Sequence, residues 1–298
     1  MGGRSHHDEV QWPLTREMFR TRRHGTGDNM RLLVLTSDRF GTASNCFPAL
    51  YENQQCSIVR VIISRGLLPN RWRTWERKLK KVLRIGPLGA LNGVRMRSWY
   101  RGHTTDLKVL CERFGIPVFE TDYTNSDETV RLFKEATPDL GLSLGNDYIS
   151  HRVFSIPKFG MINVHGERLP EYQNAQSVIW PIYHLETTTG LTIHQIDRTI
   201  DTGKILYREE YPIVFCAKLE DTVRKTIEVT QQRTPAAVRY VCESFEVLLN
   251  GAQTQKSARK FTTPTIQQFY RMVRNNHILY ERSKRSDTRV SLPETAKR

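Results

Sequence analysis

Short, nearly continuous apolar runs alternate with segments of helical spacing through the first half of the chain. The apolar runs predict buried strands of the parallel-sheet type at 30–37, 57–64, 116–120 and 140–145. Helical spacing of apolar positions predicts helices between them, at 46–53, 106–115 and 126–139. This alternation predicts an α/β fold: a doubly wound, mostly parallel, Rossmann-like sheet with helices on both faces.

The second half begins with a strand-like run that ends in the text INVHGERLP (162–170). Strands are then expected within 189–197 and 201–213, and a helix within 177–186 that Pro181 kinks or delays. The long polar-apolar stretch 219–251 predicts two helices with a break before Pro235. A short C-terminal extension with one amphipathic helix and a basic tail is expected after it.

These patterns divide the chain into three regions. Residues 1–29 are expected to form a flexible arm or a tag, because they contain no apolar segment of the signal-peptide type. Residues 30–251 are expected to form one domain with a basic insertion at 65–101, and residues 252–298 a C-terminal helix and tail. No apolar stretch approaches the length of a spanning helix.

The five cysteines indicate reduced thiols in a cytoplasmic protein, since they are odd in number, scattered through apolar surroundings and never spaced as Cys-x-x-Cys. We therefore expect neither a disulfide nor a metal site at Cys46, Cys56, Cys111, Cys216 and Cys242.

The net charge of +14 is concentrated in two places. Residues 65–101 contain eleven Lys and Arg against one acid, and residues 282–298 contain six against two, so the rest of the chain is nearly neutral. This distribution favours local contacts with anions over a uniformly basic nucleic-acid groove, and no specific nucleic acid is expected as a partner.

Within the basic segment, residues 71–86 combine an apolar stripe with Lys and Arg on the remaining positions. Three interpretations stay open: an ordinary surface helix that packs by its tryptophan face, a lip that binds the phosphates of a nucleotide-linked acceptor, or attachment to an anionic membrane surface. The stripe consists of Trp72, Trp75, Leu79, Val82 and Leu83.

Candidate chemistry lies at the end of the run that contains Asn163 and His165. Two residues apart in an extended segment, their side chains point to the same side. Asp201 begins a tight turn, helped by Gly203, between two later strands. If the three converge, they suit acyl transfer to an amine: the imidazole accepts a proton, the amide donates to an oxyanion, and the carboxylate orients the imidazole.

The surrounding text resembles the 10-formyltetrahydrofolate-dependent formyltransferases. The resemblance rests on PDLGLSLGNDYI (138–149), PKFGMINVHGERLPEY (157–172) and TGLTIHQIDRTIDTGKILYREEYPI (189–213). It implies that Asn163, His165 and Asp201 are catalytic, and that 10-formyltetrahydrofolate is the cosubstrate of a direct transfer without a metal.

In that family the pterin lies between two loops, here 143–147 and 195–200. The resemblance therefore implies cofactor contacts, many of them through the backbone, from Ser143, Leu144, Gly145, Asn146, Ile196, Asp197 and Thr199. Asp197 offers a second carboxylate for the acid role, but a loop-capping role is favoured. His194, on a strand of alternating pattern, is expected to serve packing.

The chain departs from the family pattern in the loop that faces the acceptor. Glu167 and Arg168 follow the Asn-x-His-Gly text, and Gln173-Asn174 replace the usual Arg-Gly. We therefore expect the acceptor to contact Glu167, Tyr172, Gln173 and Asn174.

The acceptor is expected to be a small-molecule amine, foremost an amino sugar on a nucleoside diphosphate. Only 47 residues follow Gly251, which counts against the additional barrel domain of the tRNA enzymes. A lipid-linked or other small amine, and less so tRNA, remain alternatives, as does a folate-binding protein without catalysis. The oligomeric state is not indicated.

Overall fold

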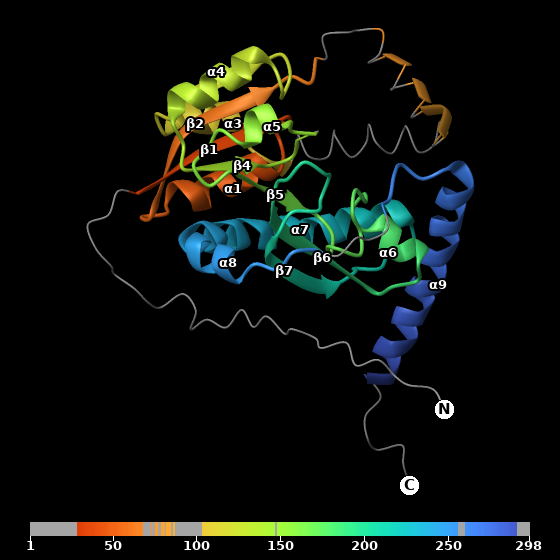
Figure 1. The fold of residues 1–298 in the computed structure, drawn as a ribbon. Helices are drawn as coiled ribbons and strands as arrows, with labels where there is room; N and C mark the ends of the chain where they lie inside the picture. The colour runs from red at the N-terminus through yellow and green to blue at the C-terminus, as the bar shows by residue number, and fades with distance from the viewer. Residues whose placement is uncertain are drawn as a thin grey trace.

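A computed structural model of the chain describes residues 29–67, 72, 75–76, 79–80, 82–84, 86, 103–146, 148–255 and 260–290. Its centre is a seven-stranded sheet in the order β3-β2-β1-β4-β5-β6-β7, parallel from β3 to β5 and antiparallel at β6 and β7 (Figure 1). The strands are β1 (Met30–Thr36), β2 (Cys56–Ser64), β3 (Val118–Thr121), β4 (Leu140–Ser143), β5 (Met161–His165), β6 (Thr188–Gln195) and β7 (Ile205–Pro212). The predicted doubly wound, mostly parallel α/β fold is confirmed.

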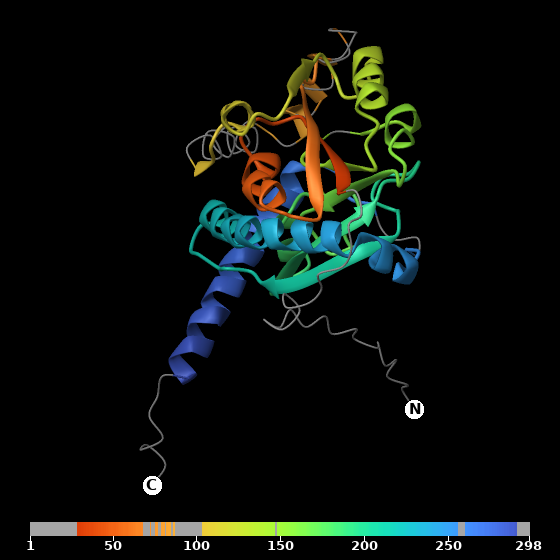
Figure 2. The same cartoon turned by 90° about the vertical axis from the view of Figure 1, so that its left-hand side faces the viewer.

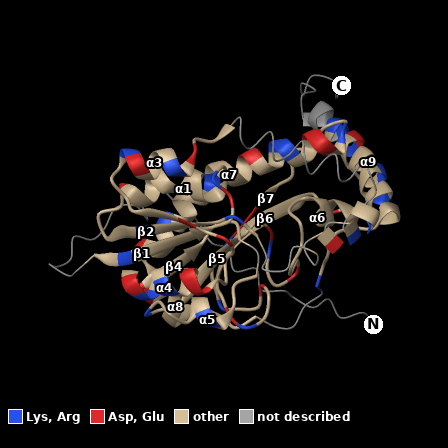
Figure 3. Cartoon of the chain, turned by 90° about the horizontal axis from the view of Figure 1, so that it is seen from above, with Lys and Arg blue, Asp and Glu red and all other residues tan. Residues whose placement is uncertain are grey.

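Helices cover both faces of this sheet (Figure 3). On one face lie α1 (Thr42–Tyr51), α3 (Leu107–Arg113) and α7 (Leu219–Glu243), and on the other α4 (Asp127–Ala136) and α5 (His151–Phe154). The remaining described helices are α6 (Ile179–Tyr183), α8 (Phe245–Gly251) and α9 (Ile266–Val290), and the described residues between 72 and 86 are also helical.

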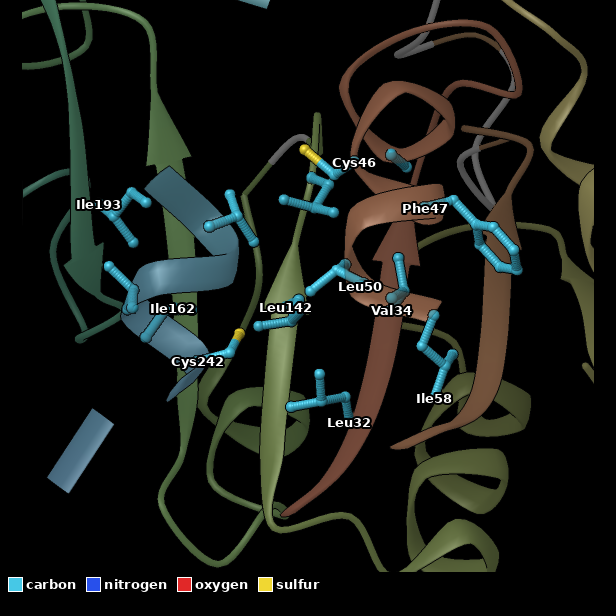
Figure 4. Close-up of a cluster of buried hydrophobic side chains, with 14 of the residues drawn as sticks. Leu32, Val34, Cys46, Phe47, Leu50, Ile58, Leu142, Ile162, Ile193 and Cys242 are labelled. Atoms are coloured by element: carbon cyan, nitrogen blue, oxygen red, sulfur yellow. The ribbon is translucent and has the colours of Figure 1, made fainter. Parts of the chain in front are cut away.

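The larger hydrophobic core lies between the sheet and the layer of α1, α3 and α7. Leu32, Val34 and Leu142 point from the sheet toward Phe47 of α1 and Cys242 of α7 (Figure 4). Each of these side chains is at most 2% exposed, so this core fixes β1 and β4 side by side. Because β2 and β3 lie on one side of this pair and β5 on the other, the crevice at the carboxyl ends of β1 and β4 is the ligand-binding position of doubly wound sheets.

Helix α7 runs unbroken through Pro235, so the predicted break there is wrong. A proline inside a helix leaves the carbonyl four residues earlier, here that of Gln231, without its donor. The side-chain amide of Asn45 in α1 donates to this carbonyl at 2.5 Å. Tertiary packing thus supplies the missing hydrogen bond, and the helix ends instead at Ser244.

The C-terminal extension contains the last described helix, α9. Helix α9 packs on α6 through a cluster that contains Trp180, Met272 and Leu279, and its far end projects beyond the body of the protein (Figure 2). Within the described residues, no helix combines the length and the apolar character that crossing a membrane requires. The predicted arm, most of the insertion 65–101 and the tail from 291 lie outside the described residues.

Candidate active site

The register of three adjacent strands places polar side chains in a row across the sheet. Ser143 of β4 is the partner of Asn163 of β5, and Asn163 is the partner of His194 of β6. Partners in neighbouring strands share a face of the sheet, so their side chains are adjacent. His165 lies two residues beyond Asn163, on the same face.

Asp201 completes this row from the turn between β6 and β7. Its φ of 56° is left-handed, a conformation that Asp tolerates better than most residues. Gly203 is required in this turn because a Cβ there would lie 1.9 Å from the carbonyl oxygen of Gln195. The turn folds back tightly on β6 and directs the Asp201 carboxylate toward the two imidazoles.

The carboxylate of Asp201 lies between the rings of His165 and His194. Its Oδ2 is 3.6 Å from His165 Nδ1, and its Oδ1 is 3.5 Å from His194 Nε2. The backbone N–H of Asn174 donates to Oδ2 at 2.9 Å. The side chain of Asp201 is 12% exposed, so these partners interact with little screening by water.

A chain of hydrogen bonds sets the orientation of the Asn163 amide. Asn146 donates from Nδ2 to the carbonyl of Leu35 at 2.6 Å and to Ser143 Oγ at 3.1 Å. Ser143 in turn donates to Asn163 Oδ1 at 3.0 Å. The Nδ2 group of Asn163 therefore faces His194 Nε2, 3.3 Å away, and remains available as a donor at the strand end.

Backbone carbonyls set the tautomers of both histidines. His165 Nε2 lies 2.9 Å from the carbonyl oxygen of Tyr172, which can only accept, so Nε2 bears the hydrogen. In the neutral ring the lone pair is then on Nδ1, the atom that faces Asp201. His194 Nδ1 donates likewise to the carbonyl of Gln195 at 2.8 Å.

The electrostatics keep His165 neutral and Asp201 charged. Burial lowers the pKa of His165 below its ordinary value, and the charge of Asp201 offsets this only in part. Burial would raise the pKa of Asp201, but His194, His165 and the Asn174 N–H outweigh it and hold that pKa at about 2. A neutral imidazole beside a carboxylate can accept a proton and stabilise the resulting charge.

These groups open onto a cavity of about 390 Å³. Ile149, Val164 and Ile196 give it apolar walls. Its polar lining includes the three predicted catalytic residues. It also includes six further polar residues: Ser143, Asn146, Asn174, His194, Asp197 and Thr199.

Six of the seven predicted cofactor contacts lie on this cavity. Ser143, Gly145, Asn146, Ile196, Asp197 and Thr199 line it, whereas Leu144 is buried at 2% exposure and does not. Asp147, in the predicted loop 143–147, lies outside the described residues. The carboxylate of Asp197 accepts from Thr202 Oγ1 at 2.7 Å, consistent with the loop-capping alternative.

Of the four predicted acceptor contacts, only Asn174 lines the cavity. Tyr172 points away from it, donates from its hydroxyl to Glu186 and stacks on Phe261. Gln173 is 1% exposed and bonds to Gln255 of the C-terminal extension. Their side chains support the loop from outside, so the expectation that they contact the acceptor is not supported by their positions.

Glu167 is fully buried and anchors the same loop. Its Oε1 accepts from the backbone N–H of Val178 at 2.6 Å and from Thr189 Oγ1 at 2.8 Å. Val178 has a φ of 70°, which is strained for a β-branched residue, so this hydrogen bond holds an unfavourable conformation. Glu167 therefore shapes the loop rather than lining the cavity.

We expect Glu167→Gln to remove a pH dependence of stability. Burial raises the pKa of Glu167 to about 7 from 4.5. A carboxyl whose pKa is raised in the fold stabilises the protein below pH 4.5. This contribution to the free energy of unfolding, on the order of 3 kcal/mol, is lost as the pH rises through 7. The amide keeps the acceptor for Val178 and does not titrate.

The measurement is the free energy of urea unfolding of wild type and variant from pH 5 to pH 8. The advantage of Glu167→Gln should grow with pH, while Glu246→Gln, at an exposed carboxyl of α8, should show no such trend. A difference between Glu167→Gln and wild type that is constant across this range would contradict the buried titration.

Sequence reasoning did not select His194, which it assigned to packing. The structure places its ring, 2% exposed, between Asn163 and Asp201. The alternation of side chains along the strand could have indicated the face on which His194 lies, since His194 and Thr192 must share one face of β6. What was missing was the antiparallel register that pairs His194 with Asn163.

The fold and this site define a class: a doubly wound α/β protein with a polar, base-containing cavity at the carboxyl ends of its central strands. Residues 100–238 match the family model described as formyl transferase. Through this region the chain is similar to the formyl transferase family.

Curated relatives match about a third of the chain. The methionyl-tRNA formyltransferase of Geobacter metallireducens is 33% identical over 108 residues, which are 36% of this chain and 35% of the relative. The enzyme of the same name from Geotalea uraniireducens is 36% identical over 108 residues, 36% of this chain and 34% of the relative. The match thus spans about a third of the length of these relatives.

Among solved structures, glycinamide ribonucleotide transformylase 1 from Symbiobacterium toebii shares the fold with a TM-score of 0.51 and 15% sequence identity. The superposition covers 75% of this chain and 92% of that protein. Across the part of this chain that the structure describes, no group of three or more His, Cys, Asp or Glu side chains is placed to hold a metal ion.

Proposed function

We propose that this protein transfers the formyl group of 10-formyltetrahydrofolate to a primary amine. The observation that supports this most is the convergence of Asn163, His165 and Asp201 on one cavity, from β5 and from a turn 36 residues later. An amide donor, a neutral imidazole and a charged carboxylate are the groups that acyl transfer to an amine requires.

In the proposed reaction the unprotonated amine attacks the formyl carbon. The new carbon–nitrogen bond forms while the carbonyl oxygen becomes an oxyanion, which accepts a hydrogen bond from the Asn163 amide. His165 takes the proton of the attacking nitrogen at Nδ1, and Asp201 stabilises the imidazolium. The bond from the formyl carbon to the folate nitrogen then breaks, and the proton passes to that nitrogen.

The residues that line the cavity support a folate cosubstrate. Ile149 and Ile196 provide apolar walls for a flat heteroaromatic ring. The loops that contain Gly145 and Asp197 provide backbone groups on either side, as the predicted contacts require. When bound, the folate supplies the activated formyl group, and the chain supplies proton transfer and oxyanion stabilisation.

The test is release of tetrahydrofolate from 10-formyltetrahydrofolate in the presence of a panel of amines. The panel contains nucleoside-diphosphate amino sugars, glycinamide ribonucleotide, initiator methionyl-tRNA and simple amines. Release that depends on one acceptor, with a matching formylated product, supports the proposal. Tight folate binding without transfer to any of them would favour a binding protein instead.

For the acceptor we propose an amino sugar carried on a nucleoside diphosphate. The net charge of +14, concentrated in 65–101, favours an anionic substrate. Asn174, where the sequence departs from the common family pattern, lines the cavity. In the panel above, saturation by a diphosphate-linked sugar at lower concentration than by the free amino sugar supports this choice.

A second candidate function, attachment to an anionic lipid surface, is favoured by the exposed apolar stripe of the segment 71–86. Trp72 is 79% exposed, Trp75 72% and Leu83 70%. Indole rings beside lysine and arginine suit the lipid–water interface, and phosphate binding alone would not need them.

We expect the protein to float with vesicles that contain phosphatidylglycerol but not with neutral vesicles, and high salt should release it. Replacing Trp72 and Trp75 by alanine should weaken binding at least about tenfold. Val247→Ala, which removes a side chain 75% exposed on α8, is the control. Self-association that the two tryptophan replacements abolish, without vesicle binding, would identify a second copy as the partner instead.

A further inference from the structure

The C-terminal extension contacts both loops that meet at Asp201. One is the loop after β5, residues 166–178, and the other is the turn between β6 and β7, residues 196–204. Residues 252–255 follow α8, and residues 260–261 precede α9. They form backbone bridges beside both elements: Gln253 with Ile205, the first residue of β7, and Lys260 with Gln173 of the loop after β5.

Gln255 joins the two loops directly through its side chain. Its Nε2 donates to the carbonyl of Gly203 at 2.6 Å, two residues after Asp201. Its Oε1 accepts from Gln173 Nε2 at 3.3 Å. One half-buried amide therefore spans from the Asp201 turn to the loop that follows His165.

A second set of contacts fixes Asn174, the residue whose N–H bonds to Asp201. The N–H of Phe261 donates to the carbonyl of Gln173 at 2.9 Å, and Asn174 Nδ2 donates to the carbonyl of Phe261 at 2.7 Å. Asn174 has a φ of 55°, so its backbone conformation depends on such support. The ring of Phe261 stacks on Tyr172, with centroids 5.2 Å apart.

We propose that residues 253–255 together with residues 260–261 act as a clamp that positions Asp201 against His165, with Gln255 and Asn174 as its positioning residues. The Gln173-Asn174 pair, which departs from the usual Arg-Gly text, thereby has a role of its own: both side chains bond to the extension. The distance from Asp201 to His165, 3.6 Å, leaves room for this carboxylate to drift once the clamp is broken.

The test compares Gln255→Ala with Gln253→Ala. Gln253 belongs to the same segment, its side chain is exposed, and only its backbone bonds to Ile205. The first readout is the titration of His165 by NMR, assigned with His165→Gln. The titratable groups that face this ring are Asp201 and His194, and Asp201 raises the pKa of His165.

In Gln255→Ala we expect the pKa of His165 to fall below its wild-type value as Asp201 withdraws, because the carboxylate raises it. The kcat of formyl transfer should fall roughly tenfold or more with KM nearly unchanged, because misplacement affects the transition state more than binding. Gln253→Ala should match wild type in both. Asn174→Gly, which keeps the backbone conformation but loses the amide, should resemble Gln255→Ala and serves if the latter does not fold.

The kinetic readout rests on the proposed function, whereas the titration does not. A shifted His165 in Gln255→Ala, with no formyl transfer by wild type, leaves the clamp standing and removes the function. A lower melting temperature for Gln255→Ala with an unshifted His165 and an unchanged kcat would make the segment merely structural and overturn the clamp.

Discussion

We expect His165→Ala to lower kcat/KM for the proposed formyl transfer by at least about a hundredfold, because it removes the imidazole that we propose accepts the amine proton. In the structure the lone pair of this neutral ring is on Nδ1, since its Nε2 hydrogen is engaged by the Tyr172 carbonyl. The measurement is initial-rate formation of tetrahydrofolate across a range of acceptor concentrations, at a pH where His165 is neutral in wild type.

Two further measurements make this expectation specific. His277→Ala, at an exposed position of α9, controls for the loss of an imidazole far from the cavity. Binding of a stable formyl-folate analogue to His165→Ala should stay close to wild type, since the ring acts on the reacting amine. Full transfer activity in His165→Ala would remove the assignment of this residue as the base.

Asp201→Asn lowers kcat by a factor of about 10² and also moves the acidic limb of the pH–rate profile. The neutral form of His165 is the active one, so the pKa of His165 sets this limb. The carboxylate raises that pKa, and the amide does not. The limb should therefore move to lower pH in Asp201→Asn, while the plateau falls because the imidazolium is no longer stabilised.

The same replacement affects stability with a defined sign. A carboxyl whose pKa is about 2 in the fold and 3.8 when unfolded stabilises the protein above pH 3.8. That contribution, on the order of 2 kcal/mol, is lost as pH falls through 2. Rates must therefore be compared where circular dichroism shows both proteins folded. Asp122→Asn, at an exposed ion pair with Arg65, is the matched control.

A profile for Asp201→Asn that falls in height but keeps its acidic limb in place would contradict the coupling of Asp201 to His165. Such a result would mean that Asp201 supports the turn alone. The left-handed φ of 56° at Asp201 suits a purely structural role in the turn. The position of the acidic limb of the pH–rate profile therefore distinguishes that role from coupling to His165.

Sequence patterns located most elements because burial on both faces of a parallel strand leaves a continuous apolar run. The predicted strand 30–37 corresponds to β1 at Met30–Thr36, and the predicted helix 106–115 to α3 at Leu107–Arg113. The sequence patterns gave a wrong prediction at Pro235, because they did not reveal the contact that Asn45 makes with this helix. A residue 190 positions away in the chain supplied the bond that local rules say is missing.

At the site, the sequence by itself determined which groups are available: an amide and an imidazole two residues apart on β5, and a carboxylate in a glycine turn. Those identities follow from side-chain chemistry and from the two-residue period of a strand. Only the tertiary structure decided which of the other residues join them. The β5–β6 register placed His194 beside Asn163. The side chains of Glu167, Tyr172 and Gln173 are instead buried away from the cavity. The physical reason is that these contacts depend on strand pairing and loop packing between distant segments, which no local pattern encodes.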